Sequence, residues 1–377
     1  MVNWYPNRYD AFDGDFIQRH AKAASLQNDI YVLFARPCPG QKEVESCVSR
    51  NEGLTEERLY LPLHNGLVGK LQNYREWKHQ LKIRIAYLVK TQHPDLIHVH
   101  VPWKIGLLAV WAKKKYAIPY IVSEHWGIYN EIVPDNIYTR SFLVRSLLKK
   151  IFVQANAFVS VSRFLGEAVN HTLVKKRFTV IPNVVDTSLF YFTPDTASIF
   201  TFIHISNMTA GKNVGTILKA YKRFLENASI PTRFIFIGQN DAFYFQQAQA
   251  MELASAVSFK GGLSYSTVAN ELQKAHCHVL CSNSETFSCV TAEALCCGVP
   301  VIAPFAGALP ELVNSHNGYL VNPDNEEELL SAMHDVVKTY QAFDRAGIAV
   351  HAAAKYDFKE VAAQFDQLYS SIIAKTV

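Results

Sequence analysis

Residues 285–311 read ETFSCVTAEALCCGVPVIAPFAGALPE, and this stretch predicts a loop, a helix and a buried strand in succession. Glu285 and Glu293 stand eight positions apart. A helix that begins between them therefore carries one carboxylate at its first turn and the other about two turns inside. The apolar residues 300–303 are typical of a strand in a parallel sheet that is covered on both faces.

The chemistry of this stretch points to a ligand that contains both phosphate and sugar. A helix N-terminus with free N–H groups binds anions, and the backbone of Phe287, Ser288 and Cys289 is expected to present such groups. A carboxylate accepts hydrogen bonds from neighbouring sugar hydroxyls. The alternative is a solvated helix that bears two acids and binds no ligand.

The same alternation of short apolar strands and amphipathic helices extends along the chain in both directions. Helical patterns such as 71–89 and 214–226 separate the strands. This order is the βαβ pattern of parallel sheets covered by helices. The predicted strands are 30–35, 96–101, 120–123, 157–162, 179–182, 200–205, 234–238, 257–260, 276–281, 300–303 and 318–321.

Strand and helix signals lapse between Pro182 and Pro194, which predicts a domain boundary near residue 187. The sequence therefore predicts two Rossmann-like α/β domains, 1–187 and 188–355, that bind ligands at the carboxyl ends of their strands. Residues 37–65 carry no readable pattern and are expected to form variable loops. Only residues 1–5 precede the first turn, so the first strand is expected to be short or incomplete.

Composition excludes several classes of protein. The chain has 377 residues, 49% of them hydrophobic, with 37 Lys+Arg against 33 Asp+Glu, which excludes disorder, collagen and coiled coil. A net charge of +4 does not indicate a nucleic-acid binder. Five of the seven cysteines fall in apolar runs and are expected to be reduced thiols of a cytoplasmic protein. We expect neither a signal peptide nor a membrane-spanning helix.

The charge is unevenly distributed between the two predicted domains. Residues 1–187 carry 25 Lys+Arg and 16 Asp+Glu, or +9, and residues 188–377 carry 12 and 17, or −5. Many of the basic residues fall in helical patterns around 70–90 and 140–152, among aromatic and aliphatic side chains. Such helices can lie on an anionic membrane surface. The alternative is a solvated outer face of the domain.

Motifs in the same order as those of the retaining GT-B glycosyltransferases of family 4 run along nearly the whole chain. The stretch 285–311 resembles the family's E-x7-E motif, its following strand and its glycine-rich loop. The resemblance implies a GT-B fold: two Rossmann-like domains face each other across a cleft, and a C-terminal helix, residues 356–377, crosses back to the N-terminal domain. The other matching motifs are Gly14, Asp95–His100, Ser123–Gly127, Val159–Ser162, Ile181–Asp186, Gly211–Asn213, Phe236–Gly238, Val257–Gly261 and Tyr356–Phe358.

The resemblance implies that the C-terminal domain binds the sugar donor. Glu293 is similar to the acid that binds both ribose hydroxyls, and Glu285 to the acid that holds the donor sugar. Lys212 resembles the lysine that neutralises the departing diphosphate, although it could be a surface lysine at a helix start. Lys260 lies in the segment implied to flank the base. The backbone implied to contact sugar and diphosphate belongs to Phe287, Ser288, Cys289 and Val290.

In the N-terminal domain the resemblance implies donor and acceptor contacts. Gly14 resembles the loop glycine that lets the backbone approach a phosphate. His125 matches the histidine that faces the donor sugar, and its alternative is a hydrogen-bonded structural histidine. We place His100 and Trp126 on the acceptor side.

Two positions depart from the family pattern. Asn207 stands where the family usually carries an arginine, so one positive charge at the diphosphate is missing. The Asn207 amide can still donate a hydrogen bond, so we keep Asn207 among the residues expected to bind the nucleotide sugar. Ala308 replaces the second glycine of the later loop.

We expect no metal site. His98 and His100 share one strand face, but no third ligand is evident in the sequence, and Cys277 and Cys281 lie too far apart on a strand for one zinc ion. Asp13-Gly14-Asp15 matches a metal-binding D-x-D motif only formally, and we expect Asp13 or Asp15 to cap a helix.

The resemblance implies transfer of a sugar from a nucleotide diphosphate sugar, most plausibly a UDP- or GDP-sugar, with retention of configuration and without a cofactor. The expected acceptor is a saccharide or a lipid-linked saccharide, in the synthesis of cell-surface polysaccharide or glycolipid. We expect a cytoplasmic enzyme, peripheral on the inner face of the membrane if the basic helices bind there. The rival hypotheses are a catalytically silent GT-B scaffold that binds a partner or a nucleotide, and an epimerase or phosphorylase of the same fold.

Overall fold

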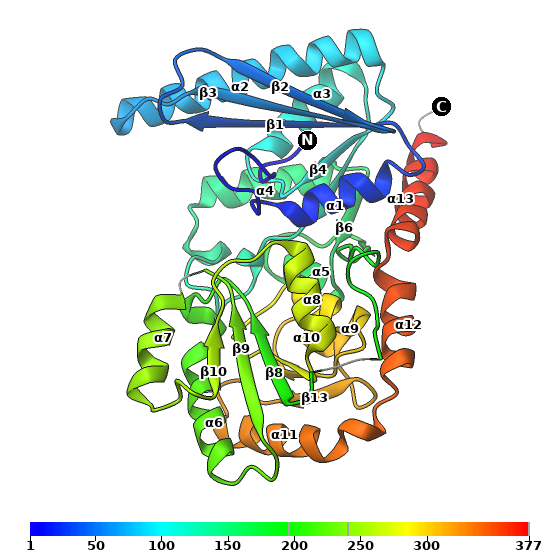
Figure 1. The fold of residues 1–377 in the computed structure, drawn as a ribbon. Coiled ribbons are helices and arrows are strands. Elements are labelled where there is room, and N and C mark those ends of the chain that lie inside the picture. The colour runs from blue at the N-terminus through cyan, green and yellow to red at the C-terminus, as the bar shows by residue number, and fades with distance from the viewer. Residues whose placement is uncertain (195–196, 240, 376–377) are drawn as a thin grey trace. The chain divides into compact units, whose positions relative to one another are not determined.

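The structure is a computed structural model that describes residues 1–194, 197–239 and 241–375 (Figure 1). The chain forms two compact units. The N-terminal unit contains Met1–Val184 and Phe358–Val377, and the C-terminal unit contains Val185–Asp357. The divisions fall within a few residues of the positions 187/188 and 355/356 predicted from the sequence.

A four-stranded parallel sheet is one of the two sheets of the N-terminal unit, in the order β4-β5-β6-β7. Its middle strands are buried apart from the half-buried Ala157, which explains their apolar sequences. The strands are β4 (Ile97–His100), β5 (Tyr120–Glu124), β6 (Ala157–Ser160) and β7 (Thr179–Val180).

A second sheet contains the residues expected to form variable loops, and that expectation is wrong. β2 (Glu45–Asn51) and β3 (Leu54–Pro62) form an antiparallel hairpin, and β3 pairs in parallel with β1 (Ile30–Cys38). The acids Glu56 and Glu57 interrupt the apolar pattern of β3, although both are buried. Glu57 accepts hydrogen bonds from the hydroxyls of Tyr31 and Ser46, both at 2.7 Å, so burial is compatible with its charge.

The first strand is reduced to one β-bridge between the two sheets. Val2 pairs in parallel with His100 on β4, and its N–H donates to the carbonyl of Leu33 on β1 at 3.3 Å. This pairing confirms the expectation of a short first strand.

The C-terminal helix belongs to the N-terminal unit, as the resemblance implied. α13 (Phe358–Ile373) lies beside α1 (Asp15–Ala24) in Figure 1, and its residues Val361 and Phe365 share a buried cluster with Ile121 of β5. The remaining helices of this unit are α2 (Gly66–Gln92), α3 (Ile105–Tyr116), α4 (Phe142–Gln154), α5 (Arg163–Thr172) and two single turns, Gly127–Tyr129 and Ile137–Thr139.

The C-terminal unit is built on one six-stranded parallel sheet in the order β10-β9-β8-β11-β12-β13. This order places the start of the chain path at the centre of the sheet, as in doubly wound nucleotide-binding folds. The strands are β8 (Phe200–Ile205), β9 (Thr232–Ile237), β10 (Val257–Phe259), β11 (Cys277–Val279), β12 (Val301–Pro304) and β13 (Gly318–Val321).

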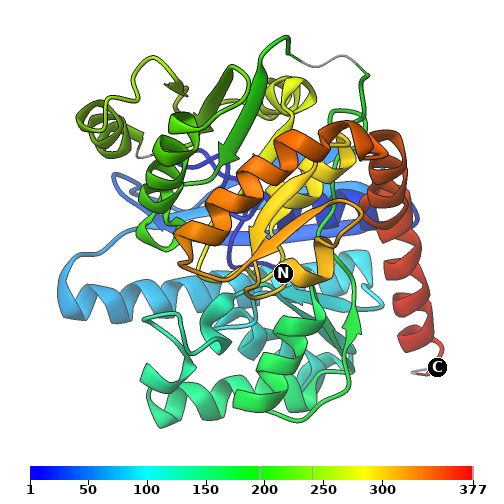
Figure 2. The same ribbon diagram turned by 90° about the horizontal axis from the view of Figure 1, so that it is seen from below.

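Aromatic side chains fill the core of this unit. Phe202, Phe234 and Phe236 are fully buried and pack against α6 and α11, which lie side by side in Figure 2. The helices are α6 (Val214–Glu226), α7 (Asp241–Ala250), α8 (Tyr265–Lys274), α9 (Cys289–Cys296), α10 (Leu309–Leu312), α11 (Glu326–Thr339), α12 (Arg345–Tyr356) and the single turns Ala210–Lys212 (η3) and Tyr340–Ala342.

The start of α1 corrects the expectation of an aspartate cap. Gly14 is the N-cap residue, in the left-handed conformation with φ 63°, and no side chain caps the helix. Asp15 is the first helical residue and pairs with Arg19 one turn later, at 3.0 Å. A Cβ atom on Gly14 would lie 2.5 Å from the carbonyl carbon of Trp4, so both conformation and space require glycine.

We predict that Gly14→Ala destabilises the N-terminal unit more than Gly40→Ala. Gly40 also has a left-handed φ, 76°, but its Cβ would meet nothing within 4 Å. Both variants incur the conformational cost, and only Gly14→Ala adds overpacking, of about 1–3 kcal/mol. Urea unfolding followed by tryptophan fluorescence measures the difference, because all five tryptophans lie between residues 4 and 126. Equal destabilisation by the two variants would contradict the close approach of Trp4.

Candidate active site

Two loops of the C-terminal unit are joined at the ends of their strands. The single turn Ala210–Lys212 follows β8, and the loop 282–288 follows β11. The N–H of Asn283 donates to the carbonyl of Gly211 at 2.9 Å, and the amide of Asn213 donates to the Asn283 side-chain oxygen. Because Asn213 adopts the left-handed conformation, the chain turns here from η3 into α6.

This junction brings Lys212 and Glu285 together. Lys212 Nζ lies 2.5 Å from Glu285 Oε1, and both side chains are mostly buried, at 24% and 14% exposed. The carbonyl of Glu285 accepts a hydrogen bond from Ala308 N–H at 2.9 Å. A Cβ on Gly307 would lie 2.2 Å from the same carbonyl oxygen, so the glycine-rich loop fixes the backbone of Glu285.

The helix α9 begins directly after this pair. Ser288 is its N-cap residue, with a φ of 77°, and its side chain accepts a hydrogen bond from Thr291 N–H. Glu293 lies one and a half turns inside the helix and is only 2% exposed. Phe287 is buried with its ring against Tyr356, so only its backbone is available to a ligand. Cys289 and Val290 in the first turn are half-buried.

A buried histidine that the sequence did not single out supports the turn before Lys212. His204 Nδ1–H donates to the carbonyl of Val279 at 2.8 Å, so its Nε2 accepts from the Ser206 hydroxyl at 2.8 Å. That hydroxyl oxygen in turn accepts from Met208 N–H at 3.0 Å. Burial is the main cause that lowers the pKa of His204 to about 4, and Lys212 lowers it further. The imidazole is therefore neutral at physiological pH.

Two further residues, Asn207 and Lys260, were predicted to bind the nucleotide sugar, and each interacts with a neighbouring side chain of the C-terminal unit. Asn207 is exposed, and its side-chain oxygen accepts a hydrogen bond from the Thr209 hydroxyl at 3.2 Å. Lys260 Nζ forms an ion pair with Glu271 of α8 at 2.6 Å. Their roles toward a donor stay predictions.

In the N-terminal unit a buried carboxylate holds the turn that carries His125 and Trp126. Glu124 ends β5 and is fully buried. Its Oε1 accepts from His125 N–H at 2.9 Å and from Trp126 N–H at 3.0 Å, and its Oε2 accepts from the Tyr129 hydroxyl at 2.7 Å. Trp126 packs edge-on against Trp4. The sequence motif around His125 therefore has a positioning residue that we did not predict.

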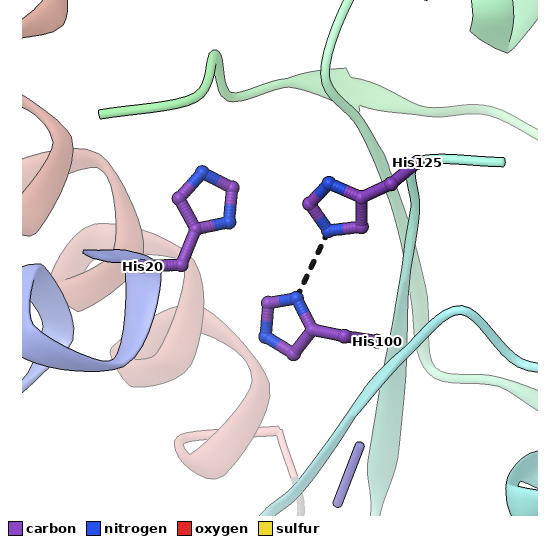
Figure 3. A group of neighbouring side chains, drawn as sticks. All are labelled: His20, His100 and His125. Atoms are coloured by element: carbon purple, nitrogen blue, oxygen red, sulfur yellow. Dashed lines mark hydrogen bonds between the residues drawn. The ribbon is translucent and has the colours of Figure 1, made fainter. Parts of the chain in front are cut away.

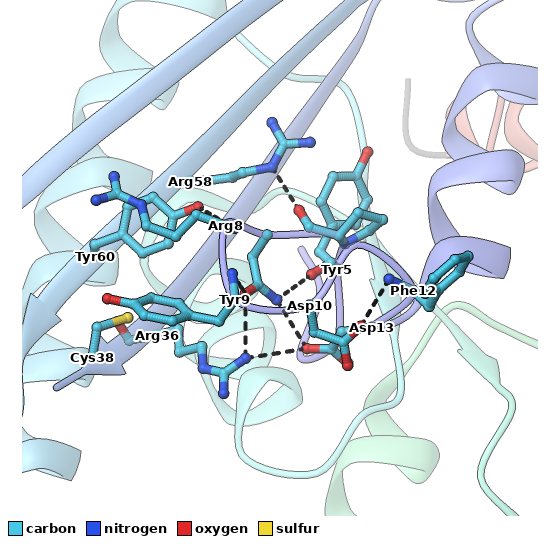
Figure 4. Close-up of polar contacts among 12 residues, drawn as sticks. Tyr5, Arg8, Tyr9, Asp10, Phe12, Asp13, Arg36, Cys38, Arg58 and Tyr60 are labelled. Carbon is cyan, nitrogen blue, oxygen red and sulfur yellow. Dashed lines mark hydrogen bonds and ion pairs between the residues drawn. The ribbon is translucent and has the colours of Figure 1, made fainter. Parts of the chain in front are cut away.

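The loop before Gly14 is tied to β1 and β3 by arginines and polar side chains (Figure 4). Arg58 Nε donates to the carbonyl of Pro6 at 2.7 Å. Arg36 lies 3.7 Å from the carboxylate of Asp13, which also accepts from the Asn7 amide at 3.2 Å. These contacts position Gly14 from both sides.

His20, His100 and His125 form a cluster of buried histidines in the N-terminal unit (Figure 3). His100 Nδ1 and His125 Nε2 are 3.0 Å apart and hydrogen-bonded. The ring of His20, from α1, lies 5.3 Å from that of His125 between ring centroids. No local sequence pattern predicts that His20 belongs here, because only the packing of α1 against the sheet brings it near His100 of β4 and near His125, which follows β5.

The predicted site residues thus form two groups, one in each unit. Glu285, Lys212, Glu293 and the start of α9 lie together in the C-terminal unit, whereas Gly14, His100, His125 and Trp126 lie in the N-terminal unit. The first group combines a fixed cation, two acids and a helix N-terminus. This chemistry, on a pair of α/β units, is that of a glycosyltransferase of the GT-B class.

Comparison with known proteins establishes the family. Residues 197–349 match the family "Glycosyl transferases group 1", and residues 26–189 match "Glycosyltransferase Family 4". The chain belongs to the group 1/family 4 glycosyltransferases. It is 26% identical over 62% of its length to the phosphatidylinositol N-acetylglucosaminyltransferase gpi3 subunit of Schizosaccharomyces pombe, and the match spans about half (53%) of that relative.

Solved structures share the fold. Sucrose-phosphate synthase of Thermosynechococcus elongatus superposes with a TM-score of 0.77 at 18% identity, covering 96% of this chain and 93% of that one. Anabaena HepE, solved with UDP and glucose, superposes with a TM-score of 0.68 at 18% identity and 98% coverage of both chains. These likenesses confirm the GT-B fold predicted from the sequence.

We predict that Glu124→Gln becomes more stable relative to the wild type as pH rises. Burial raises the pKa of Glu124 from its usual 4.5 to about 7. The folded state then binds this proton more tightly than the unfolded state, so the contribution of Glu124 to stability is present below about pH 4.5 and is lost as pH rises through about 7. Glutamine has no such proton.

The measurement is the melting temperature of both proteins at about pH 5 and about pH 8. Unfolding exposes the buried histidines, which then bind protons in part of this range, but this effect is common to both proteins and cancels in the difference. A difference between the two melting temperatures that stays constant across this range would show that Glu124 is not titrating.

Proposed function

We propose that the enzyme transfers a sugar from a UDP- or GDP-sugar to a hydroxyl of a saccharide or lipid-linked saccharide, with retention of configuration, in the synthesis of cell-surface polysaccharide or glycolipid. The observation that carries the proposal is the 2.5 Å pair of Lys212 and Glu285 at the start of α9, with Glu293 buried in the same helix. HepE, of the same fold, holds UDP and glucose.

The donor contacts follow from the charges of this group. A diphosphate that arrives at the N-terminus of α9 meets free N–H groups and the Lys212 ammonium. The Lys212 ammonium then interacts with the phosphate as well as with Glu285. The Glu285 carboxylate can accept hydrogen bonds from hydroxyls of the donor sugar. Glu293 accepts from the ribose hydroxyls, because a carboxylate can accept from two neighbouring hydroxyls at once.

Transfer needs little covalent participation by the protein. No carboxylate acts as a nucleophile in this proposal. The acceptor oxygen bonds to the anomeric carbon as the bond to the phosphate breaks, and the departing phosphate takes the proton of the acceptor hydroxyl on the same face of the sugar. Lys212 and the α9 N–H groups stabilise the negative charge that develops on that phosphate. His125 faces the donor sugar in this proposal and positions it. Neither a metal ion nor an organic cofactor takes part.

The rival function is a GT-B scaffold that binds a nucleotide or a partner without turnover. Asn207 favours it, because an amide stands there, five residues before Lys212, in place of the arginine that the family usually carries. The first prediction below separates the two functions.

The exposed helices of the N-terminal unit support a cytoplasmic enzyme that is peripheral on an anionic membrane. Leu67 at the start of α2 is 84% exposed and Phe142 at the start of α4 is 79% exposed. Exposed lysines and an arginine, Lys70, Arg75, Lys78, Lys149 and Lys150, accompany them. None of the helices in the described part of the chain has the length and apolar character to span a bilayer.

Two of the basic residues that we associated with this surface serve the fold instead. Arg84 binds the buried Glu57 at 2.6 Å, and Lys82 Nζ lies 4.6 Å from the ring centre of Trp111. Fewer basic side chains are therefore available to a membrane surface than the sequence indicated.

We predict that Lys212→Ala lowers kcat by about 10²–10³-fold, because it removes the charge that stabilises the leaving diphosphate.

We also predict that Glu293→Gln weakens nucleotide binding by about 10–100-fold, since hydrogen bonds to a charged group contribute about 1.5–3 kcal/mol. The donor is found first by thermal shift with UDP, GDP and ADP, and turnover is then measured by release of the diphosphate.

The matched control is Lys219→Ala, which removes an exposed lysine from α6 in the same unit. Its activity should equal that of the wild type. Nucleotide binding without turnover of any UDP-, GDP- or ADP-sugar would favour the silent scaffold over the transferase.

We predict that the protein sediments with vesicles containing phosphatidylglycerol at low salt and is released by high salt, because each Lys or Arg near an anionic surface contributes about 1 kcal/mol. The double variant Leu67→Asp/Phe142→Asp should stay in the supernatant. Leu26→Asp, at another exposed leucine of this unit, is the control and should still sediment. Wild-type protein that does not sediment at low salt would refute membrane binding.

A further inference from the structure

The histidine cluster of the N-terminal unit has the spacing of a metal site. One ring nitrogen from each of His20, His100 and His125 lies within 4.8 Å of those of the other two. Nitrogens that share one zinc ion at about 2.0–2.1 Å are about 3.0–3.4 Å from one another. The 3.0 Å between His100 Nδ1 and His125 Nε2 already fits, and the His20 nitrogen has to move closer by at most about 1.8 Å.

The tautomer of His20 leaves a lone pair for an ion. Its Nε2 lies 2.9 Å from the carbonyl oxygen of Pro182, which can only accept, so Nε2 carries the proton. Nδ1 of the neutral ring therefore carries the lone pair. It is buried and has no hydrogen-bond partner among residues 1–194, 197–239 and 241–375. A metal-binding histidine typically donates its other N–H to a backbone carbonyl in this way.

Burial keeps the three imidazoles neutral, so that each ring carries one N–H and one lone pair. It lowers the pKa of His20 to about 4 and holds the pKa values of His100 and His125 well below their usual range. Asn183 interacts with His125 and opposes this shift, but burial is the larger cause. A neutral ring does not have to lose a charge-bearing proton to bind an ion, but the proton shared between His100 Nδ1 and His125 Nε2 has to move to the other nitrogen of its ring.

An ion can reach the cluster from within the same unit. A cavity of about 580 Å³ between α1, α13 and the strands β1 and β4 has His20, His98 and His100 in its wall. His98 itself is not available as a ligand, because its two ring nitrogens are 2.7 Å from the hydroxyls of Tyr369 and Ser123. The cavity leaves room for a water molecule as a fourth ligand.

We propose that His20, His100 and His125 together bind one divalent transition-metal ion such as Zn²⁺. Three neutral imidazoles and an open position suit Zn²⁺, Co²⁺ or Ni²⁺, whereas Mg²⁺, Ca²⁺ and Mn²⁺ prefer oxygen ligands. The ion does not serve the proposed transfer. A bound ion holds the His125 ring among its ligands and prevents the ring from facing the donor sugar. The ion therefore inhibits transfer, and this inhibitory role rests on the proposed function.

The test uses untagged, metal-free protein titrated with Co²⁺. We expect one Co²⁺ per chain, with the visible absorption of a tetrahedral site, without the near-ultraviolet band of cobalt–thiolate bonds, and with three paramagnetically shifted imidazole N–H signals in the NMR spectrum. His20→Ala should weaken the affinity at least tenfold, and His79→Ala, which removes an exposed histidine of α2, should leave it unchanged. Circular dichroism of the metal-free variants confirms that each is folded.

Wild-type protein that shows no such absorption, or that shows thiolate ligation, would overturn the site, whether or not His20→Ala folds. If Co²⁺ binds but Zn²⁺ leaves transfer activity unchanged at saturation, the inhibitory role is wrong and the site stands. A protein without transferase activity would refute the proposed function, while the cobalt spectrum still decides the metal site.

Discussion

The ion pair between Lys212 and Glu285 is the contact on which the proposed chemistry of the C-terminal unit depends. A lysine and a glutamate 2.5 Å apart and mostly buried are stable only if the backbone holds both in place, because each loses hydration. Three sets of contacts provide this. Asn283 joins the two loops, Ala308 and Gly307 fix the backbone of Glu285, and Ser206 with His204 supports the turn before Lys212.

This arrangement explains why a unit in the acidic half of the chain can be proposed to bind a diphosphate. Net charge acts over long distances and is screened by salt, whereas a buried lysine and the first N–H groups of a helix act at contact distance. The acid that neutralises Lys212 in the absence of ligand is also the one proposed to hold the sugar. In the proposed complex the diphosphate becomes a second partner of Lys212, and hydroxyls of the sugar donate hydrogen bonds to Glu285.

The N-terminal unit faces a related constraint with neutral groups. His20, His98, His100 and His125 lie within a largely apolar interior, where protonated rings would be costly. Hydrogen bonds to Pro182, Tyr369, Ser123 and one another keep most of the ring nitrogens paired, and Glu124 fixes the turn that carries His125. The Nδ1 of His20 is one ring nitrogen without a hydrogen-bond partner in the described part of the chain, and its free lone pair points to a ligand.

The sequence by itself determined the two α/β units, their strands and the family, because buried parallel strands leave continuous apolar runs and motif spacing is written along the chain. It predicted Glu285, Lys212 and Glu293 for the same reason. It did not determine the β2–β3 hairpin, since the burial of Glu56 and Glu57 depends in part on the hydroxyls of Tyr5 and Tyr31, which are distant in the chain. Only the tertiary structure decided that Gly14, not an aspartate, caps α1 and that His20 joins His100 and His125, because these facts depend on close approaches between segments that no local pattern records.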